Sequence, residues 1–274
     1  MKSNIEMITV ILTIFTLIPT LVSLIFVERQ LRMQNKREKL ELVLNLYREL
    51  FLNNRFMSIL GVLDENPISK RNEGIKTIID KTQSGADNEI TEKDLISFLN
   101  YFNSLSILVE NHVMTKEFVL DIFKYQIQAI FSSINLIEYI EDYQFDKMKR
   151  LVPSNFFFYG TLIDKSKRSN INDLKGINDF LTDQGTPVKL SDYVIQDQVR
   201  PNLFYPALIK SIGNSCIGNL VSIDKKASWT EIFKTLDNYE EVNGDTEHGS
   251  ALYKRCIVKL DATDNGYAWA YVKS

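Results

Sequence analysis

The chain has 274 residues, a length that suffices for one large domain or two modest ones. Apolar residues make up 45% of the chain and charged residues 24%, which argues against disorder and favours a packed globular protein. The net charge of −3 provides no overall basic field of the kind that attracts nucleic acid, so no nucleic-acid partner is expected.

An uncharged apolar stretch, Met7–Val27, lies near the amino terminus. As a helix it extends about 30 Å, the thickness of a bilayer core, and a proline such as Pro19 is tolerated in membrane spans. We therefore predict a transmembrane anchor in residues 1–27. A cleaved signal peptide is the alternative, but its apolar core is shorter and a small-x-small cleavage site follows it, whereas Glu28-Arg29-Gln30 follows here.

Basic residues are distributed unequally on the two sides of this stretch. Lys2 and the amino terminus precede it, whereas five basic residues follow within fifteen positions: Arg29, Arg32, Lys36, Arg37 and Lys39. The positive-inside rule then places the downstream chain in the cytoplasm. We expect a single-pass protein of an inner or plasma membrane, whose soluble part is cytoplasmic and for which the membrane is one partner.

Residues 28–150 are predicted to form a cytoplasmic helical region. Apolar residues keep helical spacing from Glu28 to Phe51, so the anchor and the first soluble helix are expected to form one rod. The segment 64–90 is polar and contains two glycines, which predicts a loop with one short helix around Ile75–Ile79.

Two further helices complete the predicted helical region. Thr91 followed by Asp94 three positions later is typical of a helix start. Another helix is predicted to open after Thr115, with this inner face: Phe118, Ile122, Tyr125, Ile130, Ile134, Ile137 and Ile140. We interpret the apolar stripes as the core of a small antiparallel bundle rather than as a ligand site. A homo-oligomer formed through stripes that the bundle leaves uncovered remains an alternative.

The pattern changes at Pro153 from helical spacing to short apolar runs separated by turns. The runs are Phe156–Tyr159, Tyr193–Ile195, Pro206–Ile209, Cys216–Ile223, Tyr253–Leu260 and Ala268–Val272. A helix is predicted after Ser228, and a loop with a helix around Ile171–Leu181 is predicted within residues 164–185. Residues 154–274 are therefore predicted to form an α+β domain with a curved or barrel-like sheet.

Three segments of this domain form a motif. The stretch Phe156–Leu162 reads Phe-Phe-Phe-Tyr-Gly-Thr-Leu, so a buried strand is expected to end in a glycine loop whose amides face a ligand. Leu236–Glu240 reads Leu-Asp-Asn-Tyr-Glu, and Tyr253-Lys254-Arg255 and Trp269-Ala270-Tyr271 follow. In this order the segments resemble the gamma-glutamylcyclotransferase-like family over about residues 154–274. The resemblance implies a gamma-glutamylcyclotransferase-like mixed β-barrel domain over these residues and says nothing about the first half of the chain. Together with the transmembrane helix and helical bundle predicted above from the apolar pattern, it gives an α+β chain.

The resemblance also implies an activity and a set of site residues. The family's substrates are γ-glutamyl amines or peptides, which are cleaved by intramolecular cyclisation to 5-oxoproline without a cofactor. Glu240 stands at the position of the catalytic proton carrier. The implied substrate-binding residues are Tyr159, Gly160, Thr161, Leu162, Tyr253 and Tyr271. Arg255 is predicted either to pair with a carboxylate or to lie at the surface.

Other interpretations stand beside this one. The acidic residues around Glu240 are also typical of a solvated loop, and Glu241 stands where the family has glycine. A non-catalytic sensor of a small ligand, coupled to the membrane helix, is therefore the main alternative to an enzyme, and an effector that oligomerises in the bilayer is a third. With only two cysteines, two histidines and no Cys-x-x-Cys, neither a disulfide framework nor a metal site is expected.

Overall fold

The computed structural model describes residues 29–30, 34, 37–65, 68–81, 89–143, 145–174, 176–181, 185–200, 203–224, 226–240, 242, 253–261 and 266–273. The transmembrane helix predicted over Met7–Val27 lies outside these residues. Within them, no helix combines the length and the apolar character needed to cross a bilayer. The chain divides into two compact units, Met1–Asn53 and Asn54–Ser274. In the first unit, residues 37–52 are helical, as their spacing predicts.

Among the described residues, the second unit begins with five α-helices. They are α2 (Asn54–Leu63), α3 (Ile68–Asp80), α4 (Glu92–Glu110), α5 (Lys116–Ile130) and α6 (Ile134–Asp142). The N-terminal start of α4 is confirmed, because the Thr91 N–H donates to Asp94 Oδ2 at 2.9 Å. The prediction for residues 64–90 was wrong in extent, since α3 is a full helix that buries Ile75 and Ile78.

The single helix predicted from Thr115 to Ile140 is in fact two helices. Ser133 caps α6, where its hydroxyl accepts a hydrogen bond from the Leu136 N–H at 3.4 Å. The predicted inner face of α5 was also partly wrong, because Phe118 and Tyr125 are exposed while Phe123 and Ile127 are buried. The break at residues 131–133 changes which residues of the two helices share a face.

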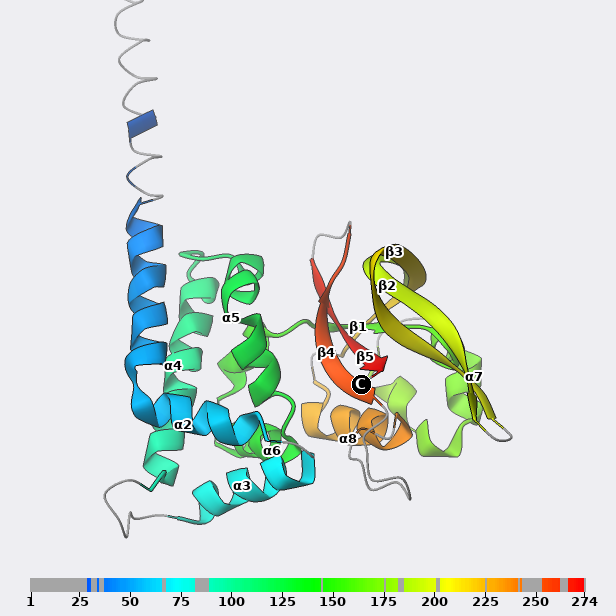
Figure 1. Ribbon diagram of the computed structural model, residues 1–274, viewed down its shortest axis with the longest axis horizontal. Helices are drawn as coiled ribbons and strands as arrows, with labels where there is room; N and C mark the ends of the chain where they lie inside the picture. The colour runs from blue at the N-terminus through cyan, green and yellow to red at the C-terminus, as the bar shows by residue number, and fades with distance from the viewer. Residues whose placement is uncertain are drawn as a thin grey trace, which may run out of the picture. The chain divides into compact units, whose positions relative to one another are not determined.

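A mixed five-stranded sheet forms after the 3-10 helix Asp146–Leu151 (Figure 1). Its strands are β1 (Asn155–Phe158), β2 (Thr186–Arg200), β3 (Leu203–Ser222), β4 (Tyr253–Lys259) and β5 (Tyr267–Lys273), in the order β2-β3-β1-β5-β4. β1 and β5 are parallel and the other neighbours are antiparallel. The predicted barrel was wrong in its closure: among the described residues, β2 and β4 are edge strands that do not pair. They approach each other where the Asp261 N–H donates to the Lys189 carbonyl at 3.4 Å.

Three of the predicted short runs belong to one long hairpin, β2–β3, rather than to separate strands. The register shifts once, between Ser191 and Tyr193, where Asp192 adopts a φ of 63°. Asp192 Oδ1 accepts a hydrogen bond from the Gly213 N–H at 2.9 Å, so the side chain supports the irregularity that bends the hairpin. Polar residues at this bulge interrupt the apolar pattern without interrupting the strands.

One face of the sheet packs against α8 (Trp229–Tyr239), drawn orange in Figure 1. Its start is confirmed, because the Ser228 hydroxyl accepts from the Glu231 N–H at 3.2 Å. The ring of Phe233 lies 5.3 Å from that of Trp269 on β5 and 5.9 Å from that of Phe156 on β1. The opposite face carries the other apolar cluster: Phe157, Tyr159, Leu190, Leu208, Val258, Leu260, Ala268, Ala270 and Val272. The helix predicted around Ile171–Leu181 is in fact two short 3-10 helices, Asn172–Leu174 and Ile177–Asp179, and the α-helix of this segment, α7 (Lys165–Asn170), precedes them.

Candidate functional site

The glycine loop begins where β1 ends. Gly160 has a φ of +59° and opens the 3-10 helix Gly160–Ile163. A Cβ at this position would lie 2.1 Å from Cγ of Pro206 on β3. Glycine is required here because of its backbone angle and because the loop packs directly on Pro206. The sequence predicted a glycine that lets the backbone approach a ligand, but the observed close approach is to a neighbouring strand.

The residues around Gly160 face in two directions. Tyr159 and Leu162 are buried, and the Tyr159 hydroxyl donates to the Tyr271 carbonyl at 2.7 Å. The Leu162 N–H donates to the Tyr159 carbonyl at 3.2 Å. Within the described part of the chain, the N–H groups of Gly160 and Thr161 donate to no acceptor. These two amides and the exposed Thr161 side chain are therefore the part of the loop that is available to a ligand.

The C-terminal end of α8 meets this loop. The hydroxyls of Thr161 and Tyr239 lie 2.9 Å apart and form a hydrogen bond, although 78 residues separate them. Glu240 follows Tyr239 as the C-cap of α8, where its N–H donates to the Leu236 carbonyl at 2.9 Å. Its side chain is half-buried. The structure thus brings the end of the Leu-Asp-Asn-Tyr-Glu segment to the Tyr-Gly-Thr-Leu loop.

The charge of Glu240 affects the pKa values of two buried tyrosines. Burial raises the pKa of Tyr159 well above its usual value, and the negative charge of Glu240 raises it further. The pKa of Tyr271 is also raised, by burial, then by Asp237 and, less strongly, by Glu240. Both tyrosines are therefore neutral hydrogen-bond donors at physiological pH.

A buried ion pair fixes α8 one turn before Glu240. Arg255 Nη1 lies 2.9 Å from both carboxylate oxygens of Asp237, and the two side chains are 2% and 3% exposed. The Tyr271 hydroxyl donates to Asp237 Oδ1 at 2.7 Å. Burial raises the pKa of Asp237, while Arg255 and Tyr271 oppose that rise. Of the two alternatives left open for Arg255, the structure shows the carboxylate partner.

Tyr253 and Tyr271 were predicted to line a substrate pocket, and both are buried. The Tyr253 hydroxyl lies 3.4 Å from the Pro206 carbonyl, which places it on the strand segment that packs against Gly160. Tyr271 contacts Asp237 and Tyr159 through its hydroxyl and its carbonyl, respectively. Their part in substrate binding stays a prediction. Sequence reasoning assigned no role to Tyr239, although it lies inside the motif and bonds to the glycine loop.

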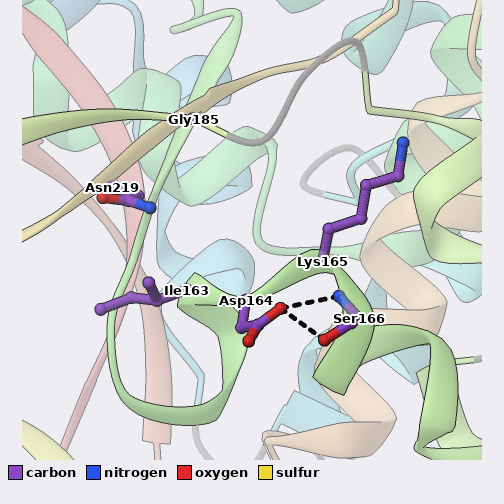
Figure 2. Close-up of a pocket in the computed structure, with 6 residues that line it drawn as sticks. All are labelled: Ile163, Asp164, Lys165, Ser166, Gly185 and Asn219. Carbon is purple, nitrogen blue, oxygen red and sulfur yellow. Dashed lines mark hydrogen bonds between the residues drawn. The ribbon is translucent and has the colours of Figure 1, made fainter.

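An open pocket of about 660 Å³ lies beside this site (Figure 2). It is lined by Ile163, Asp164, Lys165, Ser166, Gly185 and Asn219. Asp164 Oδ1 accepts hydrogen bonds from the Ser166 N–H and hydroxyl, both at 2.8 Å, so these polar groups are engaged within the first turn of α7. None of the predicted site residues lines this pocket. Among the described residues, no group of three His, Cys, Asp or Glu is placed to hold a metal ion.

Two family models match the chain. The model for "Domain of unknown function (DUF4760)" matches residues 4–151, and the model for "Gamma-glutamyl cyclotransferase, AIG2-like" matches residues 156–274. No curated protein matches the chain.

Solved structures match the C-terminal part of the chain. One titled "Gamma-glutamyl cyclotransferase" is 17% identical with a TM-score of 0.31, and the match covers 44% of this chain and 66% of that one. A solution structure of an Arabidopsis thaliana protein is 21% identical with a TM-score of 0.27, and the match covers 43% of this chain and 61% of that one. The chain thus spans less than two thirds of the length of either structure.

Proposed function

We propose that this chain cleaves a γ-glutamyl amide by intramolecular cyclisation. The chain belongs to the DUF4760 family through residues 4–151, and it carries an AIG2-like gamma-glutamyl cyclotransferase domain over residues 156–274. The observation that supports the proposal is the Thr161–Tyr239 hydrogen bond, which holds the residue next to Glu240, the C-cap of α8, against the Gly160 loop. The membrane anchor predicted over Met7–Val27 is part of the proposal and would hold this domain at the cytoplasmic face of a membrane.

The proposed reaction needs one proton carrier and no water. Glu240 removes a proton from the α-ammonium group of the substrate, and the freed amine attacks the substrate's own γ-carbonyl carbon. A C–N bond forms in a five-membered ring, the γ-carbonyl oxygen takes up negative charge, and the bond to the departing amine breaks. The carboxyl group of Glu240 returns its proton to that amine. It then takes the second proton, which the ring nitrogen loses on becoming a lactam N–H, and passes it to the departing amine, which leaves as an ammonium ion. The products are 5-oxoproline and the free amine.

The surroundings of both groups support these roles. Glu240 is a half-buried residue whose charge raises the pKa values of Tyr159 and Tyr271, so fewer water molecules compete for the proton than at an exposed position. The unpaired N–H groups of Gly160 and Thr161 are donors of the type that stabilise a developing oxyanion. Gly160 and Thr161 are the first two residues of the 3-10 helix Gly160–Ile163, and the first N–H groups of a helix have no acceptor within it.

The test is the release of 5-oxoproline by the full-length chain from a panel of γ-glutamyl amines and γ-glutamyl dipeptides. Glu240→Gln removes the proton carrier and is expected to lower kcat by about 100-fold or more, within the range found for general acid–base groups. Glu231→Gln is the matched control, since Glu231 is exposed on the same helix. Failure of every compound to yield 5-oxoproline, or equal activity of the two variants, refutes the proposal.

A second candidate function is recognition of a small ligand without turnover. It is favoured by Glu241, which stands next to Glu240 where the resembled family has glycine and adds a second negative charge. A γ-glutamyl compound that raises the melting temperature of the chain, yet is recovered unchanged after long incubation, favours this candidate over the enzyme.

A further inference from the structure

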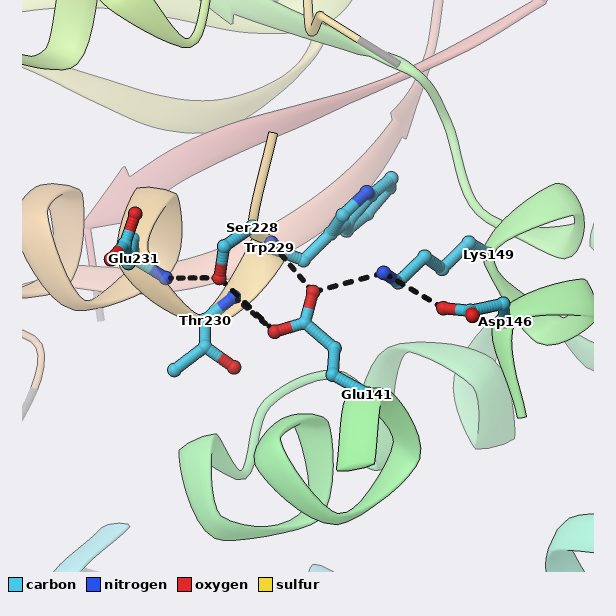
Figure 3. Close-up of polar contacts among 7 residues, drawn as sticks. All are labelled: Glu141, Asp146, Lys149, Ser228, Trp229, Thr230 and Glu231. Carbon is cyan, nitrogen blue, oxygen red and sulfur yellow. Dashed lines mark hydrogen bonds and ion pairs between the residues drawn. The ribbon is translucent and has the colours of Figure 1, made fainter. Parts of the chain in front are cut away.

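Glu141, on α6 of the helical region, caps the first turn of α8 (Figure 3). Its Oε1 accepts a hydrogen bond from the Trp229 N–H at 2.8 Å, and its Oε2 accepts from the Thr230 N–H at 3.3 Å and from the Ser228 hydroxyl at 3.1 Å. The N–H groups of a first helical turn have no partner within their own helix. The Glu141 carboxylate, 87 to 89 residues away in the sequence, therefore accepts hydrogen bonds from N–H groups at the start of α8 and interacts favourably with the helix dipole.

Glu141 is itself held in place. Lys149 Nζ lies 2.9 Å from Glu141 Oε1 and 3.1 Å from Asp146 Oδ1, and the Glu141 side chain is 18% exposed. Burial raises the pKa of Glu141, but the hydrogen bonds from Lys149, Thr230 and the Trp229 N–H outweigh it and leave the pKa below its usual value. The carboxylate is thus a charged, fixed cap at neutral pH rather than a mobile surface group.

The helical region also holds α8 near its other end, through Arg255. The Arg255 Nη2 donates to the carbonyl of Phe131, the C-cap of α5, while its Nη1 binds Asp237 one turn before Glu240. The guanidinium carbon lies 3.6 Å above the Phe233 ring of α8, which adds a cation–π contact. Arg255 therefore links the junction of α5 and α6 to the last turn of α8.

The edge strand β4 is held by the same helices. Gln128 Oε1 accepts a hydrogen bond from the Ile257 N–H at 2.9 Å, and Lys259 Nζ lies 2.9 Å from Asp121. A side chain of α5 thus satisfies a backbone donor on the outer edge of the sheet. With the α8 contacts, these bonds fix the helical region against both elements that flank Glu240 in the sequence.

We propose that Glu141 is a positioning residue for the carboxylate of Glu240 and that it acts through α8. The helix is 11 residues long, about 16 Å at 1.5 Å per residue, and Glu240 is the residue that ends it. We expect a helix this short to move as one body, so a shift of its first turn is transmitted to its last. A displacement of about 1 Å at a reacting group is enough to lower a rate by about 100-fold. The helical region thereby controls the geometry of the site. The expected effect on the rate rests on the proposed function.

Kinetics of the full-length chain test the first consequence. In Glu141→Gln, an NH2 group replaces one acceptor oxygen, and we expect kcat for 5-oxoproline release to fall about tenfold or more while KM changes less than about twofold. Ser133→Ala is the control for stability, since it removes the cap of α6 without touching α8. Glu138→Gln is the control for the interface, since it removes only the exposed Lys234–Glu138 pair between the same two helices.

Amide hydrogen exchange tests the second consequence without any substrate. The donors Trp229 and Thr230 should exchange faster in Glu141→Gln, and so should Glu240 and Val242, whose N–H groups bind the Leu236 and Asp237 carbonyls at 2.9 Å. Faster exchange at all four sites in Glu141→Gln alone supports positioning. Unchanged exchange at Glu240 and Val242, or equal losses of kcat in Glu141→Gln and Ser133→Ala, overturns it. If the wild type releases no 5-oxoproline, the proposed function fails and the exchange experiment still decides this inference.

Discussion

Removing the carboxylate of Asp237 should strongly destabilise the unit Asn54–Ser274. The ion pair with Arg255 is 2–3% exposed and has two 2.9 Å contacts, so Asp237→Ala leaves a buried guanidinium without its counter-charge and the Tyr271 hydroxyl without its acceptor. Loss of one partner of such a pair costs about 3–5 kcal/mol in the free energy of unfolding. Asp237→Ala combined with Arg255→Met removes both charges and should recover more than half of that loss.

Urea unfolding of the full-length chain followed by tryptophan fluorescence is the assay, because Trp269 lies 5.9 Å from Arg255. At a slope of about 3 kcal/mol per M, the Asp237→Ala midpoint should fall by about 1–1.7 M. Lys234→Met is the control: its ion pair with Glu138 is 50% and 40% exposed and should contribute less than about 1 kcal/mol. A loss below about 1 kcal/mol for Asp237→Ala, or a double variant less stable than the single one, would refute the reasoning.

Three further predictions concern single positions. Gly160→Ala should lower the free energy of unfolding by at least about 1–2 kcal/mol, because φ is +59° and the new Cβ meets Pro206. Gly61→Ala in α2 is the control: its Cβ enters open space, so the free energy of unfolding should rise by about 0.5–1 kcal/mol. The urea midpoints of the two variants test both expectations. Burial lowers the pKa of Lys116 from 10.5 to about 8, so between these pH values the unfolded chain binds a proton that the folded chain has lost. The free energy of unfolding of the wild type relative to Lys116→Met should therefore rise between pH 8 and 10.5, and a difference that does not change with pH contradicts this. The pKa of Glu141 is lowered from 4.5, so its carboxylate stabilises the folded state relative to Glu141→Gln. This difference in the free energy of unfolding should be complete above pH 4.5 and should disappear as the pH falls through the folded-state pKa. Unfolding curves of both proteins at several pH values measure it.

Local signals in the sequence account for the elements that were predicted correctly. The starts of α4 and α8 follow from Thr91 and Ser228, since a cap and the apolar spacing behind it are properties of a few neighbouring residues. The break between α5 and α6 was missed because the apolar spacing continues across Phe131–Ser133 and outweighs the signal of the capping serine. The strand β3 was divided into two runs because polar residues and Gly213, opposite the bulge at Asp192, interrupt its apolar pattern.

Contacts between distant residues set what the sequence left undetermined. The burial of Arg255 depends on Asp237 and on the Phe131 carbonyl, which lies 124 residues away, and no local pattern distinguishes this arginine from an exposed one on a strand. Glu141 looks like an ordinary helical surface residue, and its role as a cap of α8 requires the packing of α6 against that helix. The approach of the C-terminal end of α8 to the Gly160 loop was expected from the motif as a whole, whereas the Thr161–Tyr239 bond that makes this contact was not.

Turnover in water labelled with oxygen-18 tests the central claim most directly. Intramolecular cyclisation uses no water, so 5-oxoproline and the free amine should form in equal amounts, and the 5-oxoproline should carry no label. Release of labelled glutamate in place of 5-oxoproline would show that water, rather than the α-amine of the substrate, attacks the γ-carbonyl, and would contradict the account.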